Sequence, residues 1–367
     1  MKKFKILFIK KYDANPKFIL NDIEILKGKF DVKVNNVKTK NSIFIIITLI
    51  KEFFYLLFNT WRFRIIFIWF ADYHSFLPVS FAKIFGKKCV ICAGGYECTY
   101  IPEINMGVFT GETFSKKVRS FCASYSLRNC GIILPVDESL IENVNTYIYS
   151  DLPNKTPLKD GMKKFLPALK TKIETIYLGY DSEAFRKINN NPKEYSVLSA
   201  GLIINDDEYK RKGFDLLIES AKYMKDVKFV LIGLNDEYAE KLSKLELRNV
   251  RLLKILNYEK LIEEYSKAKV FAQISMFEGL PSTICEAMLC ECIPVGSNVN
   301  GIPKIIDEYG FLINKRNVKD VIETLYKALN SPEELGLKAR NHIINNFSLQ
   351  NRKARLLNVL NNLLKIS

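Results

Sequence analysis

The sequence has few histidines and no paired cysteine motif. Catalysis by histidine and metal binding by cysteine therefore have few candidate residues. His74 and His342 are the only two histidines among 367 residues. His74 follows an apolar run, so it is either a hydrogen-bonded structural residue or part of a site; His342 falls in a helical stretch, and we expect it at the surface. The eight cysteines form no C-x-x-C…C-x-x-C array, and most lie in apolar runs. We expect buried thiols, not metal ligands.

A secretory signal is also missing from the start of the chain. MKKFKILFIKK is a charged lead, a short apolar run and further lysines, not a signal peptide. We therefore expect a cytoplasmic protein without disulfides.

No long apolar run is free of charge. The most apolar one, IFIIITLIKEFFYLLF at 43–58, carries Lys51 and Glu52 at its centre. Each charge costs about 2.5–3.5 kcal/mol on insertion scales, and a spanning helix needs about 20 residues. Two alternatives stay open. The run is a helix of the core, or it lies at a membrane surface with Arg62 and Arg64 near headgroups.

Acidic residues are scarce in the first half of the chain. The net charge is +15, and residues 1–180 hold 27 Lys and Arg against 15 Asp and Glu, whereas residues 181–367 hold 28 against 25. The basic half is expected to meet lipid headgroups, nucleic acid or a phosphorylated substrate, unless the charge serves only solubility. The lysines are dispersed and no nucleic-acid motif is present, so we expect no nucleic-acid partner.

The composition, 48% hydrophobic and 26% charged, is that of a globular protein, and the length predicts two domains. Continuous apolar runs alternate with helical stretches, and the pattern restarts after about residue 190. The expected strands are 5–9, 30–37, 64–70, 88–92, 131–136, 173–178, 194–201, 227–233, 250–256, 270–275 and 292–296. The expected helices are 17–28, 43–60, 75–85, 214–224, from about 236, 258–267, 282–290, 317–344 and 348–365.

This order predicts an α/β protein of two doubly wound, Rossmann-like domains with parallel sheets. Residues 1–188 form the first domain and 189–345 the second, with a linker at 189–195. Ligands of such sheets bind beyond the carboxyl ends of the strands, here in the cleft between the domains.

Two glutamates flank a turn after the strand at 270–275. In FEGLPSTICEAM, Glu278 lies in the loop and Glu286 in the following helix, which Ser282 can cap. A helix N-terminus after a strand binds anions, and carboxylates accept paired hydrogen bonds from vicinal diols. Hydroxyls at both ends and phosphates between them describe a nucleotide sugar. Taken alone, Glu286 is equally an ordinary solvated helix residue.

These residues resemble the E-x7-E signature of glycosyltransferase family 4, the retaining family with the GT-B fold. The segments that carry the resemblance are 277–288, 294–306, 209–233, 176–185 and, in the version with a GGYD-like loop, 90–109. The resemblance implies two domains facing a central cleft, an acceptor-side first domain, a nucleotide-sugar-binding second domain, and a helix at 346–367 that crosses back to the first.

The resemblance also implies roles for individual residues. Glu286 would bind the ribose of the donor, Glu278 would contact its sugar, and Lys212 would neutralise the leaving diphosphate. The expected donor contacts further include Gly279, Leu280, Ser282, Lys254 and Leu256. The acceptor-side candidates are His74, Gly94, Gly95, Tyr96 and Glu97.

The sequence departs from the family pattern in four places. Ala200-Gly201 stands where an arginine is usual, so Arg211 or Lys210 would have to assist Lys212. Gly94 stands where the family has a histidine. The segment at 10–17 lacks the family's glycines, and Lys304 replaces a glutamate.

The expected reaction is retaining transfer of a hexose, without a metal or other cofactor. No D-x-D lies in a suitable loop, and Asp206-Asp207-Glu208 is expected to be a solvated turn. The acceptor is expected to be a lipid-linked glycan or polysaccharide precursor, with peripheral contact to the anionic inner face of the membrane. The alternatives are a nucleotide-sugar-binding module without turnover and a nucleotide-sugar epimerase of the same fold.

Overall fold

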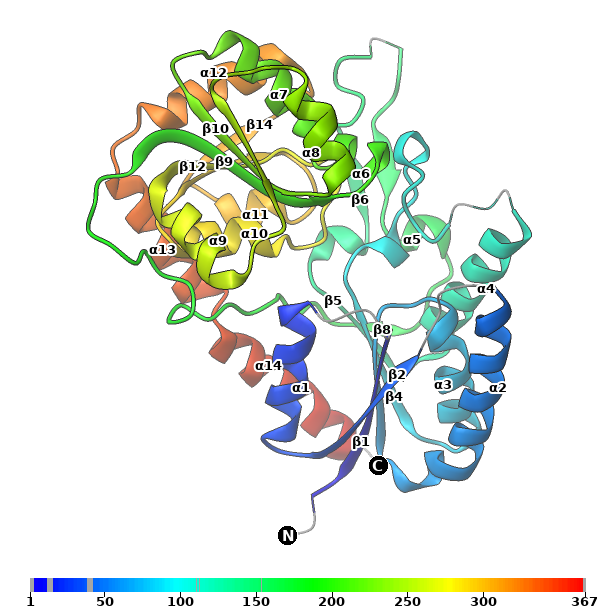
Figure 1. Cartoon of the computed structure of the whole chain (residues 1–367). Helices are drawn as coiled ribbons and strands as arrows, with labels where there is room; N and C mark the ends of the chain where they lie inside the picture. Colours follow the sequence, from blue (N-terminus) through cyan, green and yellow to red (C-terminus); the bar gives the residue numbers. More distant parts are fainter. Residues whose placement is uncertain are drawn as a thin grey trace. The chain divides into compact units, whose positions relative to one another are not determined.

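The chain folds into two compact units (Figure 1), seen in a computed structural model that describes residues 3–11, 16–37, 42–109, 111, 113–152 and 154–365. The first unit comprises residues 1–143, 160–179 and 350–367, and the second comprises 144–159 and 180–349. The expected glycine-free segment at 10–17 falls partly on residues 12–15, which lie outside the described residues.

The first unit is built on a six-stranded parallel sheet with the order β2-β1-β3-β4-β5-β8. Its strands are β1 (Lys5–Lys11), β2 (Asp31–Val37), β3 (Ile65–Trp69), β4 (Lys88–Ala93), β5 (Ile132–Pro135) and β8 (Lys172–Ile173). Its helices are α1 (Lys17–Lys27), α2 (Ser42–Asn59), α3 (Tyr73–Ile84), α4 (Phe114–Asn129), α5 (Met162–Phe165) and α14 (Leu349–Lys365), with short 3-10 turns η1 (Thr60–Arg62), η2 (Tyr96–Cys98), η3 (Pro102–Ile104) and η4 (Glu138–Leu140).

The second unit has a parallel sheet with the order β11-β10-β9-β12-β13-β14. Its strands are β9 (Glu194–Ile203), β10 (Lys228–Leu234), β11 (Val250–Lys254), β12 (Ala268–Gln273), β13 (Ile293–Ser297) and β14 (Phe311–Ile313). Its helices are α6 (Asp206–Arg211), α7 (Phe214–Tyr223), α8 (Asp236–Ser243), α9 (Tyr258–Lys267), α10 (Ser282–Leu289), α11 (Ile302–Ile306), α12 (Val318–Leu329) and α13 (Glu334–Asn346).

The strand orders locate the place in each sheet where a ligand is expected. In a doubly wound sheet the crossover direction reverses at one point. The loops on either side of that point run in opposite directions and leave a crevice at the carboxyl ends of the strands. The reversal lies between β1 and β3 in the first sheet and between β9 and β12 in the second. Central strands are covered on both faces, as the continuous apolar runs predict: all five residues of β3 are buried.

A segment of the first half belongs to the second unit. It begins at β6 (Asn143–Asn145) and ends at β7 (Leu158–Asp160), which pair as a two-stranded sheet. The side-chain amide of Asn145 donates to the carbonyl of Met276, and the backbone N–H of Arg316 donates to Ser150 Oγ at 2.7 Å. The sequence analysis assigned 144–159 and 180–188 to the first domain; in the structure both lie in the second unit.

The end of the chain returns to the first unit through α14, which lies beside α1 (Figure 1). The guanidinium of Arg352 makes two hydrogen bonds of 2.6 Å to the Asp22 carboxylate, and both side chains are almost fully buried. Trp69 Nε1 donates to the same carboxylate at 2.9 Å. One buried ion pair and its tryptophan partner thus join α1, β3 and α14.

The apolar run of 43–58 forms most of helix α2, and only one side of this helix belongs to the core. Leu56 is fully buried, and Glu52 faces inward, where it accepts hydrogen bonds of 2.8 and 2.9 Å from Asn35. The opposite face of the helix is exposed and apolar. Within the described residues, no helix is long and apolar enough to cross a membrane.

Two local expectations were wrong or incomplete, and one was confirmed. The predicted strand at 173–178 is reduced to the two residues of β8. His342 is buried, with its ring 4.8 Å from that of Tyr309, because α13 packs against α10 and β13. All eight cysteines are buried free thiols, as expected.

Candidate functional site

The loop after β12 is held in one conformation by its own polar side chains. Thr283 Oγ1 donates to Gln273 Oε1 at 2.7 Å, and Gln273 Nε2 donates to Ser275 Oγ. Ser297 Oγ, on the neighbouring strand β13, donates to the carbonyl of Ser275 at 2.5 Å. Because these bonds link the loop to β13 and α10, the side chain of Glu278 is presented from a rigid support.

The cations opposite this loop come from the junction of α6 and α7. Gly213 has φ +73°, and a Cβ there would lie 2.3 Å from the carbonyl oxygen of Ile274. Glycine is therefore required for the close approach of the two loops. The aliphatic stem of Lys212 passes over Gly201, where a Cβ would be 3.2 Å away. The Ala200-Gly201 sequence, which lacks the family's arginine, thus leaves room for the lysine.

One carboxylate oxygen of Glu278 contacts most of the polar groups of this region. Glu278 Oε1 lies 2.5 Å from Lys212 Nζ and 3.3 Å from an Arg211 nitrogen, and it accepts from Ser275 Oγ at 2.9 Å. Arg211 also makes two bonds to Glu208, at 3.0 and 2.6 Å. The predicted group of Glu278, Lys212 and Arg211 is therefore brought together at the carboxyl ends of β9 and β12.

The charges of this cluster are set by burial and by each other. Burial alone would raise the pKa of Glu278, but Lys212 and Arg211 hold that pKa below its usual value. Burial lowers the pKa of Lys212, and the Glu278 carboxylate partly offsets this. The carboxylate is ionised at neutral pH and holds two cations that an anionic ligand can bind in its place.

Glu286 lies inside α10 and is buried, so it is not the solvated helix residue of the alternative interpretation. Burial and the charge of Glu286 together raise the pKa of Tyr258 on the neighbouring helix α9. Gly279 and Leu280 are buried in the loop before the helix. The expectation that Ser282 caps α10 was wrong: Pro281 occupies the N-cap, no side chain makes a capping bond there, and Ser282 is the first helical residue.

Lys254 and Leu256 stand apart from this cluster. Lys254 ends the edge strand β11 and is exposed, with its Nζ 2.5 Å from Asp236. Leu256 is half-buried in the loop before α9. Lys254 pairs with Asp236 and not with Glu278, so the place of both residues against a base stays a prediction.

The first unit has a polar cluster at its own reversal point, and sequence reasoning missed its centre. Asp72 caps α3 and accepts from Arg119 at 2.8 and 2.6 Å and from Lys11. Burial alone would raise the pKa of Asp72, but Arg119 and Lys11 hold it well below its usual range. Arg119 also donates to the Tyr96 hydroxyl at 3.0 Å and lies over its ring.

The predicted acceptor-side residues lie near this cluster. Gly94, Gly95 and Tyr96 follow β4, and Gly95 has φ +135°. Glu97 is buried; its Oε1 accepts from the Gly94 N–H at 2.9 Å, and burial raises the pKa of its carboxyl to about 7.

His74 is a buried structural residue in this conformation. Its Nε2 lies 2.8 Å from the Trp69 carbonyl oxygen, so Nε2 carries the hydrogen. Burial and the charge of Lys11 lower the pKa of His74 to about 4, so the ring is neutral at neutral pH. With 1% of its surface exposed, the ring is covered by the chain around it, and its place on the acceptor side stays a prediction.

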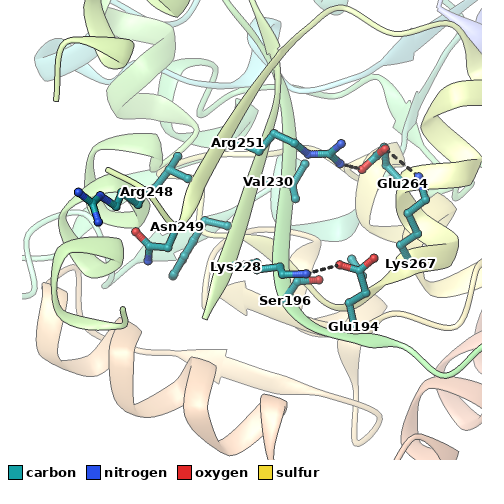
Figure 2. Close-up of a pocket in the computed structure, with 12 residues that line it drawn as sticks. Glu194, Ser196, Lys228, Val230, Arg248, Asn249, Arg251, Glu264 and Lys267 are labelled. Atoms are coloured by element: carbon teal, nitrogen blue, oxygen red, sulfur yellow. Dashed lines mark hydrogen bonds and ion pairs between the residues drawn. The ribbon is translucent and has the colours of Figure 1, made fainter. Parts of the chain in front are cut away.

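A pocket of about 440 Å³ lies at the opposite edge of the second sheet (Figure 2). It is lined at the amino ends of β9 to β12, and it contains none of the residues predicted for the donor. Its charges are largely paired with each other: Lys228 with Glu194 at 3.4 Å, and Lys267 and Arg251 with Glu264.

Among the described residues, no group of three or more His, Cys, Asp and Glu side chains is placed to hold a metal ion. Asp206 and Glu208 lie in the first turn of α6, where Glu208 pairs with Arg211. The acidic run at 206–208 is solvated, as the sequence predicted, but it starts a helix and does not form a turn.

Several functional-looking residues were not predicted. Gln273 and Ser275 bond to Glu278, and they could have been found as polar residues at the end of an apolar strand. Asp72 and Ser75 form a capping box at the start of α3, and their spacing of three residues could have been recognised in the sequence. The partners Lys11 and Arg119 have no such signal.

Comparison with known proteins finds a family similar to the second unit. Residues 181–348 match the family model of the glycosyl transferases group 1. A Campylobacter jejuni protein named N-acetylgalactosamine-N,N'-diacetylbacillosaminyl-diphospho-undecaprenol 4-alpha-N-acetylgalactosaminyltransferase is 26% identical over 253 residues, 66% of this chain and 61% of that protein. The Staphylococcus aureus poly(ribitol-phosphate) alpha-N-acetylglucosaminyltransferase is 29% identical over 193 residues, 48% of this chain and 38% of that protein. The chain thus spans about three fifths or less of the length of these relatives.

Solved structures match both units. Sucrose-phosphate synthase from Thermosynechococcus elongatus has a TM-score of 0.73 at 13% identity, with all of both chains covered. Anabaena HepE in complex with UDP and glucose has a TM-score of 0.69 at 13% identity and covers 98% of this chain and 100% of that chain. The chain therefore has the fold of the GT-B glycosyltransferases, and its residues 181–348 are similar to the glycosyl transferases group 1.

Proposed function

We propose that the protein is a retaining glycosyltransferase that moves a hexose from a nucleotide-diphosphate sugar to an acceptor hydroxyl. One observation carries the proposal. Lys212, Arg211 and Glu278 meet at the reversal point of the second sheet, where such sheets bind nucleotides, in the part of the chain that matches the glycosyl transferases group 1.

The donor diphosphate would replace Glu278 as the partner of the two cations. Lys212 and Arg211 both contact Glu278 and are mostly shielded from solvent. The two cations can therefore neutralise charge on the leaving diphosphate with little reorganisation of water around them. Glu286, buried on α10, binds the ribose hydroxyls, and the freed Glu278 carboxylate contacts the donor sugar. Gly279, Leu280 and Ser282 offer backbone amides at the start of the same helix.

The transfer itself needs no base from the protein. The acceptor oxygen bonds to the anomeric carbon on the face from which the diphosphate leaves, the bond from that carbon to the diphosphate oxygen breaks, and the acceptor proton passes to this oxygen. Lys212 supplies the positive charge that a metal ion supplies in other transferases, so we propose a metal-independent reaction.

We propose a lipid-linked glycan or polysaccharide precursor as the acceptor and the inner face of the membrane as the place of the reaction. The name of the Campylobacter relative contains a diphospho-undecaprenol-linked sugar. The +12 charge of residues 1–180 favours an anionic acceptor or surface. Tyr96, Glu97 and the glycines at 94 and 95 are the proposed acceptor-side residues.

UDP-, GDP- and ADP-sugars offered with and without a membrane extract test this proposal. UDP is the first choice, because HepE was solved with UDP and glucose. Wild type is expected to turn over one donor in preference, and Glu286→Ala to weaken its binding about tenfold or more. Equal, weak binding of all donors by both proteins would refute the role of Glu286. Tight binding without turnover in the presence of extract would refute the transferase.

A further inference from the structure

Helix α2 exposes a continuous row of apolar side chains, which we call the apolar stripe. It consists of Ile47, Ile50, Phe53, Phe54, Leu57, Phe58 and, in η1, Trp61. These positions recur at three and four residues, so they share one helix face. Phe54 is 52%, Phe58 66% and Trp61 63% exposed. A contiguous exposed patch of this kind marks an interaction site on a protein surface.

The orientation of α2 is fixed from its inner side. The carboxylate of Glu52 is buried and held by two hydrogen bonds from Asn35 on β2, and Leu56 is fully buried. The rings of Phe53 and Phe81 of α3 meet edge to face at 5.3 Å. Rotating the helix to bury the stripe would place Glu52 outside its bonds, so the stripe is a surface in the folded protein.

The exposed charges of the stretch that carries the stripe are cations, and one carboxylate of another element, Asp31 of β2, lines a pocket together with Arg62. Between residues 42 and 96 the only carboxylates are Glu52 and Asp72, and both are buried. The same stretch carries the cations Lys51, Arg62, Arg64, Lys83, Lys87 and Lys88. Lys51 and Arg62 are eleven residues apart, about three helical turns, and so border the stripe on one side. Lys87 donates to the carbonyl of Trp61 at 3.1 Å, which brings a further cation to its end.

We propose that the apolar stripe docks the protein on an anionic phospholipid membrane, with α2 lying in the plane of the interface. Aromatic side chains enter the boundary between headgroups and acyl chains, and the surrounding cations meet lipid phosphates. A second copy of the chain fits less well, because its stripe would bring the same bordering cations and no opposite charge to meet them. The proposal stands on the surface alone and does not depend on the transfer reaction.

The two tryptophans of the chain give a direct readout. Trp61 belongs to the stripe, whereas Trp69 is fully buried in β3. The full-length protein would be titrated with vesicles of equal parts phosphatidylglycerol and phosphatidylcholine and with vesicles of phosphatidylcholine alone. On the anionic vesicles the emission of Trp61 is expected to shift to shorter wavelength and to be quenched by brominated acyl chains. Trp61→Phe removes the response and leaves that of Trp69 unchanged.

A double variant tests the stripe itself. Phe54→Ser with Phe58→Ser changes two exposed residues, and co-sedimentation with the anionic vesicles is expected to fall about tenfold or more. The matched control, Tyr223→Ser with Leu337→Ser, changes two exposed apolar residues of the second unit and is expected to sediment as wild type does. Raising the salt concentration is expected to weaken wild-type binding.

Three outcomes would overturn the proposal. Wild type does not sediment with anionic vesicles, or the double variant sediments as well as wild type, or the stripe variants abolish a dimer seen by light scattering while vesicle binding is unchanged. Failure of donor turnover, measured separately, leaves the vesicle result standing.

Discussion

Lys212 is the residue whose charge the proposed reaction uses most directly. Its side chain is 13% exposed, and its Nζ lies 2.5 Å from Glu278. An ammonium group in so dry a place stabilises a developing phosphate charge more strongly than one in water.

Replacing Lys212 with methionine is expected to lower donor turnover about 10²- to 10³-fold, because the side chain keeps its length and loses its charge. Steady-state turnover of the preferred donor measures the effect. Lys222→Met, an exposed lysine of α7, is the matched control and is expected to turn over as wild type does. Full activity of the Lys212 variant would contradict the role of this cation.

Glu97 is expected to make stability depend on pH. Its carboxyl has a pKa of about 7 in the folded chain against 4.5 for an ordinary glutamate, because burial penalises the charge. The folded state therefore binds the proton more tightly, and stability falls as pH rises from about 4.5 to 7, by about 3 kcal/mol. His74 changes stability in the opposite direction between its folded pKa of about 4 and 6.5.

The variant Glu97→Gln isolates the first effect. Its free energy of unfolding, measured by urea titration, is expected to rise relative to that of wild type by about 2–3 kcal/mol from pH 5 to pH 8. His74 is unchanged in both proteins, so its contribution cancels in the difference. A difference that stays constant with pH would show that Glu97 is not protonated in the folded chain.

At the scale of elements, the site depends on two loops that approach each other closely. Gly213 joins α6 to α7, and its Cα hydrogen faces the carbonyl of Ile274 at the end of β12. The same glycine follows Lys212, so the contact between loops also places the ammonium group against Glu278.

Gly213→Ala is expected to destabilise the second unit by roughly 1–3 kcal/mol, since φ +73° and a contact of 2.3 Å both oppose a Cβ. Thermal unfolding measures the loss. Gly111→Ala is a control, because a Cβ there meets nothing closer than 4.0 Å. Donor turnover is expected to fall with the alanine at 213, and an unchanged melting temperature would contradict the close approach.

The parallel α/β order of these elements was predictable, because buried parallel strands are continuous apolar runs. The E-x7-E loop was predictable as a pair of carboxylates after a strand. The bonds of Glu278 to Lys212 and Arg211 were not, since they join residues 66 and 67 positions apart. Nor was the transfer of residues 144–159 to the second unit, which rests on single polar contacts such as that of Asn145.

At the scale of the molecule, the chain passes between its two units four times, after residues 143, 159, 179 and 349. The last passage ends in α14, whose Arg352 meets Asp22 in the interior of the first unit. Breaking one partner of a buried ion pair leaves the other charge without compensation.

Arg352→Met is therefore expected to destabilise the first unit by about 3–5 kcal/mol. Urea unfolding, followed by the fluorescence of Trp69, reports the change, because Trp69 donates to the same carboxylate. Arg355→Met, one turn further along α14 and exposed, is expected to cost less than about 1 kcal/mol. Adding Asp22→Asn to Arg352→Met is expected to restore part of the loss; no restoration would argue against an uncompensated charge.

The distance of 330 positions between Asp22 and Arg352 also has a consequence for synthesis of the protein. A ribosome adds about 5–20 residues per second, so Asp22 waits roughly 15 to 70 seconds for its partner. During that time the first unit lacks its last helix, and its charged interior stays open to chaperones and proteases. A chain cut short by a premature stop codon never closes this interior. A chain that stops before α14 therefore leaves the buried carboxylate of Asp22 without its cation.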